Sequence, residues 1–231
     1  MMVRQWDLPA LIDHTVLRPE ATKSDVVRLC HEARAYGFGV IFVPPCYAAE
    51  AVEAVSGTAI LVGIPVGFPL GGHSTATKVS EAMDGVTKGA TVLDMVINVS
   101  RLKSGDLDAV RRDIAEVVKA TTEAEHKVII ETCYLTDQEK ITACRLVVEA
   151  GADYVKTSTG FGPAGATVAD VRLLREAVAG TIKVKASGGI RDWSAAKALL
   201  EAGADRIGTS ASLAIVAEWK KDSVPSAIVR P

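Results

Sequence analysis

The sequence lacks an excess of positive charge. Its 26 Lys and Arg residues are outnumbered by 28 Asp and Glu residues, which gives a formal net charge of −2 at pH 7. A protein that holds a nucleic-acid backbone needs clustered cationic side chains to neutralise its phosphates. We therefore expect no nucleic-acid partner.

Closely spaced cysteines and long apolar runs are also missing. The four cysteines lie far apart without a Cys-x-x-Cys pair, and such thiols in apolar segments act as small hydrophobic side chains. The N-terminal residues contain no continuous apolar stretch like that of a signal peptide, and Gly63 and Pro65 interrupt the run AILVGIPVG. We predict a cytoplasmic protein with reduced cysteines and no membrane segment.

Short β-branched segments alternate with longer amphipathic segments along the chain, which is typical of repeated strand–helix units. A doubly wound open sheet is the alternative, but the G-x-G-x-x-G that usually follows its first strand is absent. The sequence therefore predicts an α/β fold of the (β/α)8 TIM-barrel class. The eight predicted strands are 11–13, 40–43, 59–65, 91–97, 127–131, 154–156, 182–185 and 206–208.

The chain offers enough apolar residues for one large core. It has 231 residues, of which 48% are hydrophobic. No linker, low-complexity tract or run of like charges divides it. We therefore expect a single domain over residues 1–231, with a loose tail at 223–231.

Local signals mark where the predicted helices begin and end. Three Thr-x-x-Asp/Glu sequences, at Thr22, Thr136 and Thr167, are typical of capping boxes, in which a hydroxyl and a carboxylate bind amides of the first helical turn. Gly151 and Gly203 lie in a repeated Glu-Ala-Gly-Ala-Asp, where a left-handed glycine ends a helix. These signals support the alternation of strands and helices and do not indicate a catalytic or binding function.

Three ionisable residues lie in apolar segments at predicted strand ends. They are Asp94 in LDMVIN, Lys156 in YVKTS and Lys185 in IKVKAS, and barrel enzymes carry their active sites at the carboxyl ends of the strands. A single lysine at such a place is normally explained by an ammonium group that reaches solvent. Two buried ammonium groups with one obvious carboxylate are seldom retained for stability alone. We therefore predict that the three residues form an active site.

Two glycine-rich turns follow the last two predicted strands. One is Ser187-Gly188-Gly189-Ile190, and the other is Gly208-Thr209-Ser210-Ala211, which is predicted to open the next helix. Glycine allows a ligand to approach the backbone, and amides at a helix N-terminus attract anions. Because the loops after strands seven and eight commonly bind phosphate in barrels, the sequence predicts a phosphate site at these turns.

Other polar residues have less specific patterns. The histidines show no metal-ligand spacing, and His31 lies inside a predicted helix. His14 and His73 follow strand ends, so they are candidates for lining the barrel mouth. The segment 63–72, GIPVGFPLGG, is equally consistent with a shaped loop and with substrate contact. The sequence leaves two roles open for Glu131, which could lie in the polar cavity or cap the next helix.

At these residues the sequence closely resembles the deoxyribose-phosphate aldolase family, whose members are class I, lysine-dependent aldolases with a (β/α)8 barrel. The match runs from Ile12 to about Ile215, and the motifs are specific in combination. Six of them occur in family order: IDHTVLRPEAT (12–22), GFPLGGHSTATK (67–78), LDMVIN (93–98), YVKTSTGF (154–161), KASGGI (185–190) and RIGTSAS (206–212).

The resemblance implies a reaction and a role for each matching residue. The reaction is the reversible cleavage of 2-deoxy-D-ribose 5-phosphate into acetaldehyde and D-glyceraldehyde 3-phosphate, without a metal or organic cofactor. Lys156 would form the Schiff base, Lys185 would be its neighbouring lysine, and Asp94 would take part in proton transfer. The expected partners are a small phosphorylated sugar and short aldehydes. Whether the chain forms a homo-oligomer is left open. The implied phosphate contacts are Gly188, Gly189 and Ser210.

Elementary electrostatics suggests why two lysines would lie together. Only a neutral amine attacks a carbonyl, and a free lysine, with a pKa of about 10.4, is rarely neutral at pH 7. A second ammonium group about 5 Å away would lower the pKa of Lys156 by about 2 at an effective dielectric constant of about 20. We therefore expect repulsion from Lys185 to activate Lys156.

This chain departs from the family pattern at three places, which affects the residue roles that the resemblance implies. Some members have a second serine where this chain has Ala211, and a phosphate-contacting lysine where it has Phe161. Some also carry a C-terminal tyrosine near the site, and the tail DSVPSAIVRP has none. Two other functions stay open: a lysine-dependent enzyme with another substrate, and a phosphosugar-binding barrel without turnover.

Overall fold

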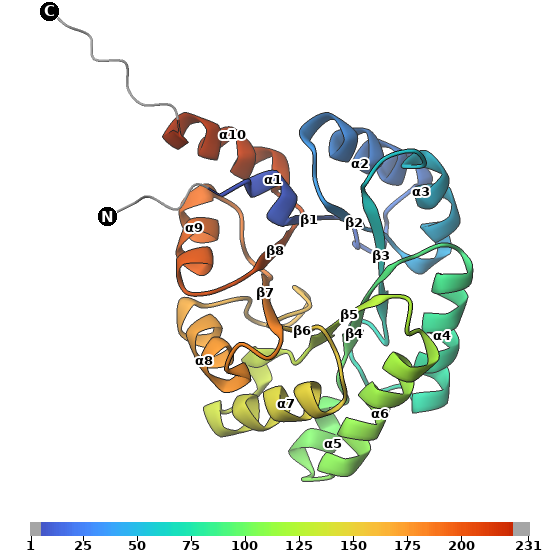
Figure 1. The fold of residues 1–231 in the computed structure, drawn as a ribbon, viewed down its shortest axis with the longest axis vertical. Coiled ribbons are helices and arrows are strands. Elements are labelled where there is room, and N and C mark those ends of the chain that lie inside the picture. Colours follow the sequence, from blue (N-terminus) through green and yellow to red (C-terminus); the bar gives the residue numbers. More distant parts are fainter. Residues whose placement is uncertain (1–5, 224–231) are drawn as a thin grey trace, which may run out of the picture.

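Eight parallel strands close into a barrel surrounded by helices (Figure 1). The computed structural model describes residues 6–223. Each strand pairs with the next one along the chain, and β8 closes the barrel against β1. The predicted (β/α)8 class is confirmed. The strands are β1 (Ile12–Thr15), β2 (Val40–Phe42), β3 (Leu61–Val66), β4 (Val92–Val96), β5 (Glu125–Ile129), β6 (Tyr154–Lys156), β7 (Lys183–Ser187) and β8 (Arg206–Thr209).

The helices surround the barrel, most of them between consecutive strands, with the first before β1 and the last after β8 (Figure 1). They are α1 (Leu8–Leu11), α2 (Lys23–Tyr36), α3 (Ala48–Ala54), α4 (Thr75–Thr87), α5 (Val99–Lys103), α6 (Leu107–Ala120), α7 (Asp137–Glu149), α8 (Val168–Val178), α9 (Trp193–Glu201) and α10 (Ser212–Ser223). Two 3₁₀ turns, η1 (Pro45–Tyr47) and η2 (Thr132–Tyr134), follow β2 and β5. None of the helices in residues 6–223 has the length and apolar character needed to cross a bilayer.

Every predicted strand overlaps an observed one, but some boundaries differ. β7 extends through Ser187, so the glycine-rich turn begins at Gly188. Helix α10 begins at Ser212, so Ser210 lies in the turn before the helix and not in its first turn. β5 ends at Ile129, which leaves Glu131 in the following loop. The predicted loose tail starts within α10, whose last residue is Ser223, and residues 224–231 lie outside the described part of the chain.

The helix caps follow the sequence signals with one exception. Thr22 and Thr136 form capping boxes as predicted. Thr167 accepts a hydrogen bond from the amide of Asp170, but the box is not completed. The Asp170 carboxylate instead lies 2.7 Å from Nζ of Lys140 on α7. This ion pair joins α7 to α8, so the third predicted capping box is wrong.

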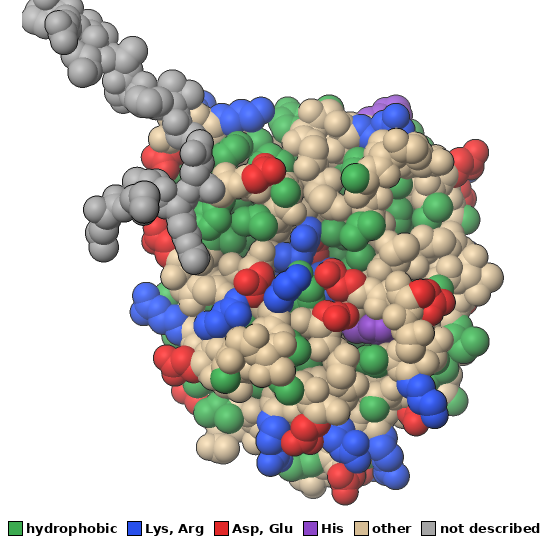
Figure 2. Space-filling view, viewed as in Figure 1, with side chains coloured by type: hydrophobic (Ala, Val, Ile, Leu, Met, Phe, Trp, Pro, Cys, Tyr) green, Lys and Arg blue, Asp and Glu red, His purple; other side chains and the backbone are tan. Residues whose placement is uncertain are grey.

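Apolar side chains fill the space between the barrel and its helices, and a smaller group fills part of the barrel interior. This inner group consists of Val40, Phe42 and Val92. Figure 2 shows side chains of both charge signs gathered around the centre of one face of the molecule, near the barrel axis. The barrel therefore combines an apolar outer layer with charged groups near its axis.

Candidate active site

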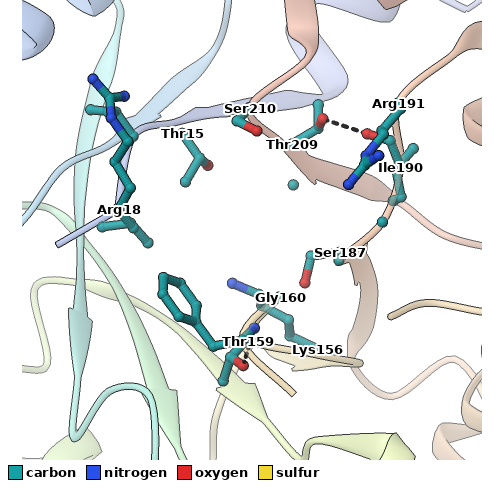
Figure 3. A pocket seen from close by; sticks show the side chains of 16 residues that line it. Thr15, Arg18, Lys156, Thr159, Gly160, Ser187, Ile190, Arg191, Thr209 and Ser210 are labelled. Carbon is teal, nitrogen blue, oxygen red and sulfur yellow. Dashed lines mark hydrogen bonds between the residues drawn. The ribbon is translucent and has the colours of Figure 1, made fainter. Parts of the chain in front are cut away.

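A cavity of about 350 Å³ opens among the loops at the carboxyl ends of the strands (Figure 3). Its wall comes from β1 and the loops after β6, β7 and β8. Lys156, Gly188, Gly189 and Ser210 all line it, so four of the predicted site residues share one cavity.

The turn after β7 requires glycine at two consecutive positions. Gly188 and Gly189 have φ values of 86° and 75°, a region that strains other residues. A Cβ on Gly188 would lie 3.0 Å from the Cα of Gly165, whereas the space beside Gly189 is open to 4 Å. The backbone at Gly189 is therefore accessible to a ligand in the cavity.

Two arginines that the sequence analysis missed also line the cavity. They are Arg18, which follows β1, and Arg191, which follows the glycine turn. The Arg18 guanidinium lies 2.6 Å from a carboxylate oxygen of Asp25, whereas the Arg191 side chain extends toward the cavity in Figure 3. Because guanidinium groups bind phosphate oxygens in pairs, Arg191 adds a cation to the predicted phosphate site.

Phe161 forms part of the cavity rim and is 49% exposed. Its ring packs edge-on against Phe68, with centroids 5.3 Å apart. Segment 63–72 therefore shapes the mouth through the contact of Phe68 with Phe161.

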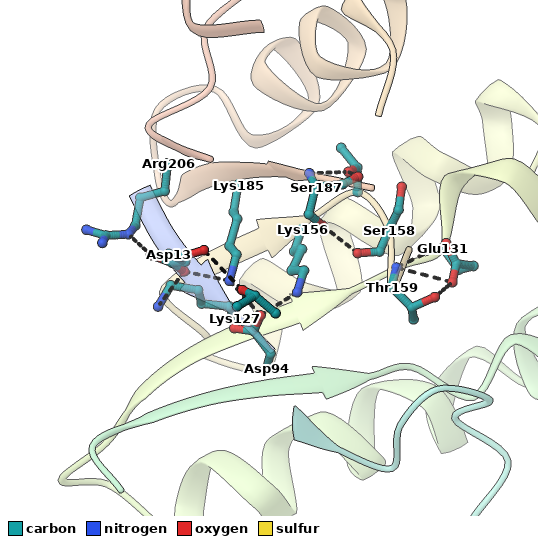
Figure 4. A network of polar contacts seen from close by, with 12 residues as sticks. Asp13, Asp94, Lys127, Glu131, Lys156, Ser158, Thr159, Lys185, Ser187 and Arg206 are labelled. Carbon is teal, nitrogen blue, oxygen red and sulfur yellow. Dashed lines mark hydrogen bonds and ion pairs between the residues drawn. The ribbon is translucent and has the colours of Figure 1, made fainter. Parts of the chain in front are cut away.

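Below the cavity, five charged side chains from five strands point into the barrel (Figure 4). Parallel register explains part of this grouping, because Lys156 pairs with Lys185 between β6 and β7 and Asp94 pairs with Lys127 between β4 and β5. Paired residues of neighbouring strands face the same side of a sheet. At most 5% of each residue is exposed: Asp13, Asp94, Lys127, Lys156 and Lys185.

Asp94 joins the two lysines predicted from the sequence. Its Oδ2 accepts hydrogen bonds from Lys156 Nζ at 2.5 Å and from Lys185 Nζ at 2.6 Å. Within residues 6–223, Oδ1 of Asp94 is buried without a hydrogen-bond partner. Lys156 ends β6, whereas Asp94 and Lys185 lie within their strands and below the mouth, which corrects their predicted position at strand ends.

Four charged residues of this cluster were not predicted from the sequence. Asp13 Oδ2 lies 2.6 Å from Lys185 Nζ and 3.9 Å from Lys127 Nζ. Arg206 Nε donates to Oδ1 of Asp13 at 2.6 Å, and Lys127 also pairs with Glu125. The signal was present, because Asp13 ends the predicted apolar strand 11–13 and Lys127 begins the predicted strand 127–131. Lys185 therefore lies between two carboxylates.

Burial is the largest influence on the Lys156 amine, and it lowers its pKa to about 8. The negative charge of Asp94 opposes this shift, and the positive charge of Lys185 adds to it. The sequence predicted a lowered pKa of Lys156 caused by repulsion from Lys185. The lowered pKa is confirmed, but burial and not repulsion is its main cause. A pKa of about 8 leaves about one amine in ten neutral at pH 7.

The neighbouring lysine has the opposite shift. Burial favours the neutral form of Lys185, but Asp13 and Asp94 outweigh burial and raise its pKa. Burial likewise opposes ionisation of the two carboxyls, and the surrounding cations nevertheless hold the pKa of both below the ordinary range. The site therefore sets a persistent ammonium group and carboxylates beside one amine that loses its proton readily.

The remaining candidates lie outside the cluster of buried charged residues. The ring of His14 is buried 2.9 Å from Ser212 Oγ and 2.8 Å from Glu32 Oε2, on the helix side of β1. His73 is exposed in the loop before α4. Neither lines the cavity, so their predicted place at the mouth is wrong. Glu131 accepts hydrogen bonds from the amide and hydroxyl of Thr159, which ties together the loops after β5 and β6.

Comparison with known proteins agrees with this geometry. Residues 9–218 match a family described as DeoC/LacD family aldolase. The chain is 53% identical over 221 residues to the deoxyribose-phosphate aldolase of Caldanaerobacter subterraneus subsp. tengcongensis, covering 94% of this chain and 96% of the relative. It is 54% identical over 214 residues to that of Thermococcus gammatolerans, covering 91% and 95% respectively.

Solved structures show the same similarity. A putative deoxyribose-phosphate aldolase from Coccidioides immitis superposes with a TM-score of 0.90 at 44% identity, covering 92% of this chain and 85% of the other. A tetrameric deoxyribose phosphate aldolase from Aeropyrum pernix gives a TM-score of 0.87 at 35% identity, with 93% and 91% covered.

Proposed function

This chain belongs to the DeoC/LacD family of aldolases, and we propose that it reversibly cleaves 2-deoxy-D-ribose 5-phosphate into acetaldehyde and D-glyceraldehyde 3-phosphate through a Schiff base on Lys156. The observation that carries the proposal is the Lys156 amine, which lines the cavity and has a pKa lowered to about 8. An amine in that state is a carbonyl nucleophile near neutral pH.

The bond changes follow from that amine. Its lone pair attacks the carbonyl carbon of the open-chain sugar, and loss of water gives a protonated imine. A base removes the proton of the sugar hydroxyl, the carbon–carbon bond breaks toward the imine, and D-glyceraldehyde 3-phosphate leaves. The enamine that stays on Lys156 takes up a proton at carbon, and water then releases acetaldehyde. The protein must therefore accept one proton and supply another at neighbouring carbon and oxygen atoms.

Asp94 is suited to handle these protons. Its Oδ2 binds both lysines, and its Oδ1 has no hydrogen-bond partner in the described part of the chain. A free carboxylate oxygen accepts a proton from a hydroxyl or a water molecule. Lys185, held between Asp13 and Asp94, supplies a fixed positive charge beside the developing negative charge.

We expect Asp94→Asn to keep imine formation and to lose aldol cleavage by about 100- to 10,000-fold. The Asp94 charge raises the pKa of Lys156, so its removal lowers that pKa and leaves a larger fraction of the amine neutral at pH 7. Borohydride trapping with acetaldehyde, followed by peptide mass mapping, measures the imine, and product assays measure turnover. An untrappable variant that still folds would place Asp94 in an earlier step.

The phosphate group is proposed to lie at the turns after β7 and β8. Gly188, Gly189, Arg191 and Ser210 line one cavity, where backbone amides, a guanidinium group and a hydroxyl are available as donors to a phosphate. None of these donors comes from Phe161 or Ala211, the positions where some family members have a lysine and a serine. Arg191 therefore provides a charged contact to the phosphate that was not predicted from the sequence.

We expect 2-deoxyribose 5-phosphate to exceed 2-deoxyribose in kcat/KM, and Gly189→Asp to remove most of that preference. A carboxylate at the open position beside Gly189 repels the phosphate dianion. The matched control is Gly189→Asn, which imposes the same backbone strain without the charge and should retain about tenfold more preference. Equal kcat/KM values for the two sugars in the unmodified protein would contradict the phosphate site.

The direct test of the function is conversion of 2-deoxyribose 5-phosphate by the purified protein. Acetaldehyde and glyceraldehyde 3-phosphate should form in equal amounts without added metal or cofactor. Borohydride with acetaldehyde should place an ethyl group on Lys156. Binding of the sugar phosphate without products would instead support a barrel that binds its ligand without turnover.

Assembly and location are further proposals. A relative from Aeropyrum pernix is described as tetrameric, and we propose a homo-oligomer for this chain, to be measured by sedimentation. The cytoplasmic location stays a prediction, which the unbridged cysteines support.

A further inference from the structure

The aromatic ring of Phe42 occupies the side of the barrel interior that carries no charge. Strands β2 and β3 contain only apolar residues, in the sequences VIF and LVGIPV. Phe42 ends β2 and is 1% exposed. Its ring centroid lies 4.0 Å from Lys185 Nζ, 5.6 Å from Lys127 Nζ and 5.7 Å from Lys156 Nζ. One ring therefore lies within cation–π range of all three ammonium groups of the barrel interior.

Gly63 makes room for this ring. Gly63 is the direct partner of Phe42 in the pairing of β2 with β3. A Cβ on Gly63 would lie 2.6 Å from Cζ of Phe42 and within 2.8 Å of both Cε atoms. No side-chain carbon fits at that distance. The ring position therefore depends on a glycine at residue 63.

We propose that Phe42 is a positioning residue for Schiff-base chemistry, in which its ring holds the Lys185 ammonium between Asp13 and Asp94 and keeps water away from the Lys156 amine. A ring face attracts a cation about 4 Å away. The same ring displaces water from the floor of the site, and burial is the largest cause of the lowered pKa of Lys156. This inference rests on the proposed function, because it assumes that Lys156 is the nucleophile.

The charges around Lys156 come from every other side of the site. Five strands supply the charged groups of the barrel, and two loops supply the arginines of the cavity. Phe42 borders the site with an uncharged side chain, so in this proposal it acts on the Lys156 amine by excluding water. The charged groups are Asp13, Asp94, Glu125, Lys127, Lys185, Arg206, Arg18 and Arg191.

The test is the pH dependence of imine formation in Phe42→Leu. Leucine keeps an apolar side chain but leaves space for water beside the lysines. We expect trapping with acetaldehyde and borohydride to fall about tenfold at pH 7 and to recover near pH 10, because a rise of one in the pKa lowers the neutral fraction tenfold. Gly63→Ala should produce the same shift, since its methyl group displaces the ring. Phe42→Met repeats the test should leucine prevent folding.

The matched control is Val92→Ala. Val92 packs in the same inner group as Phe42, so its truncation lowers thermal stability without removing the ring. Its trapping midpoint should equal that of the unmodified protein. An unchanged midpoint in Phe42→Leu, with Lys156 still trapped, would overturn the role of the ring. Absence of any trapped Lys156 in the unmodified protein would instead overturn the proposed function, and the inference with it.

Discussion

Replacement of Lys156 by methionine is expected to abolish imine trapping and to lower kcat/KM by at least about 10,000-fold. Methionine matches the length and apolar stem of lysine but has no nucleophilic nitrogen. The Lys156 amine is 2.5 Å from Asp94, which stays paired with Lys185 in the variant. The fold should therefore survive, because removal of Lys156 leaves no carboxylate in this cluster without a cation.

The matched control for this variant is Lys183→Met. Lys183 begins β7, close to Lys185 in sequence, but it is exposed. The control should retain turnover and imine formation. The measurements are the initial rate of product formation and the mass of the peptide that contains residue 156. A trapped adduct on Lys185 in Lys156→Met would reverse the assignment of the two lysines.

Replacement of Lys185 by methionine has the second-largest expected effect, a loss of turnover of about 100- to 1,000-fold. The Lys185 charge contributes to the low pKa of Lys156, so its removal raises that pKa and moves the acid limb of imine formation to higher pH. The loss of turnover should exceed the change in neutral fraction, because the fixed charge beside the reacting carbon is also lost. An unaltered pH midpoint would contradict this electrostatic contribution.

The same substitution should also change the pH dependence of stability. In the unmodified protein the pKa values of Asp13 and Asp94 are held low, so their stabilising contribution is present near neutral pH and is lost as the pH falls through those values. Without Lys185 the buried carboxylates lose a shared cation, at a cost of about 3–5 kcal/mol. The loss of stability relative to the unmodified protein should become smaller in acid, where protonation of the carboxylates removes the unpaired charge. Urea unfolding at several pH values measures it, and Lys185→Arg serves as the control that keeps the cation.

The sequence predicted the barrel because strand and helix periodicities alternate strongly along the chain. It also brought Asp94, Lys156 and Lys185 together, since each is an ionisable residue in an apolar strand. Asp13 and Lys127 also lie in apolar segments, as the last residue of the predicted strand 11–13 and the first residue of the predicted strand 127–131, but that position does not separate a charge inside the barrel from one that reaches solvent. Their depth inside the barrel follows from strand register, which one sequence does not specify.

Burial and loop position were harder to predict. The sequence suggested charge repulsion as the activator of Lys156, whereas the dominant effect of burial depends on how the barrel closes around the amine. Arg18 and Arg191 lie 173 positions apart and line one cavity because β8 pairs with β1. Such neighbours become visible only after the barrel is closed.

The interior cluster has a consequence for charge balance during turnover. Three ammonium groups and two carboxylates share the barrel interior, while the outer pair Arg206 and Glu125 cancel each other. Full ionisation therefore leaves one surplus positive charge, and deprotonation of Lys156 removes it. The protonated imine restores that charge, and cleavage moves it away from the nitrogen, because the enamine is neutral and the proton of the sugar hydroxyl passes to Asp94. Carbon–carbon cleavage thus keeps the net charge of the interior constant while it neutralises both the iminium and the Asp94 carboxylate, which favours the flow of electrons toward the nitrogen in a low-dielectric interior.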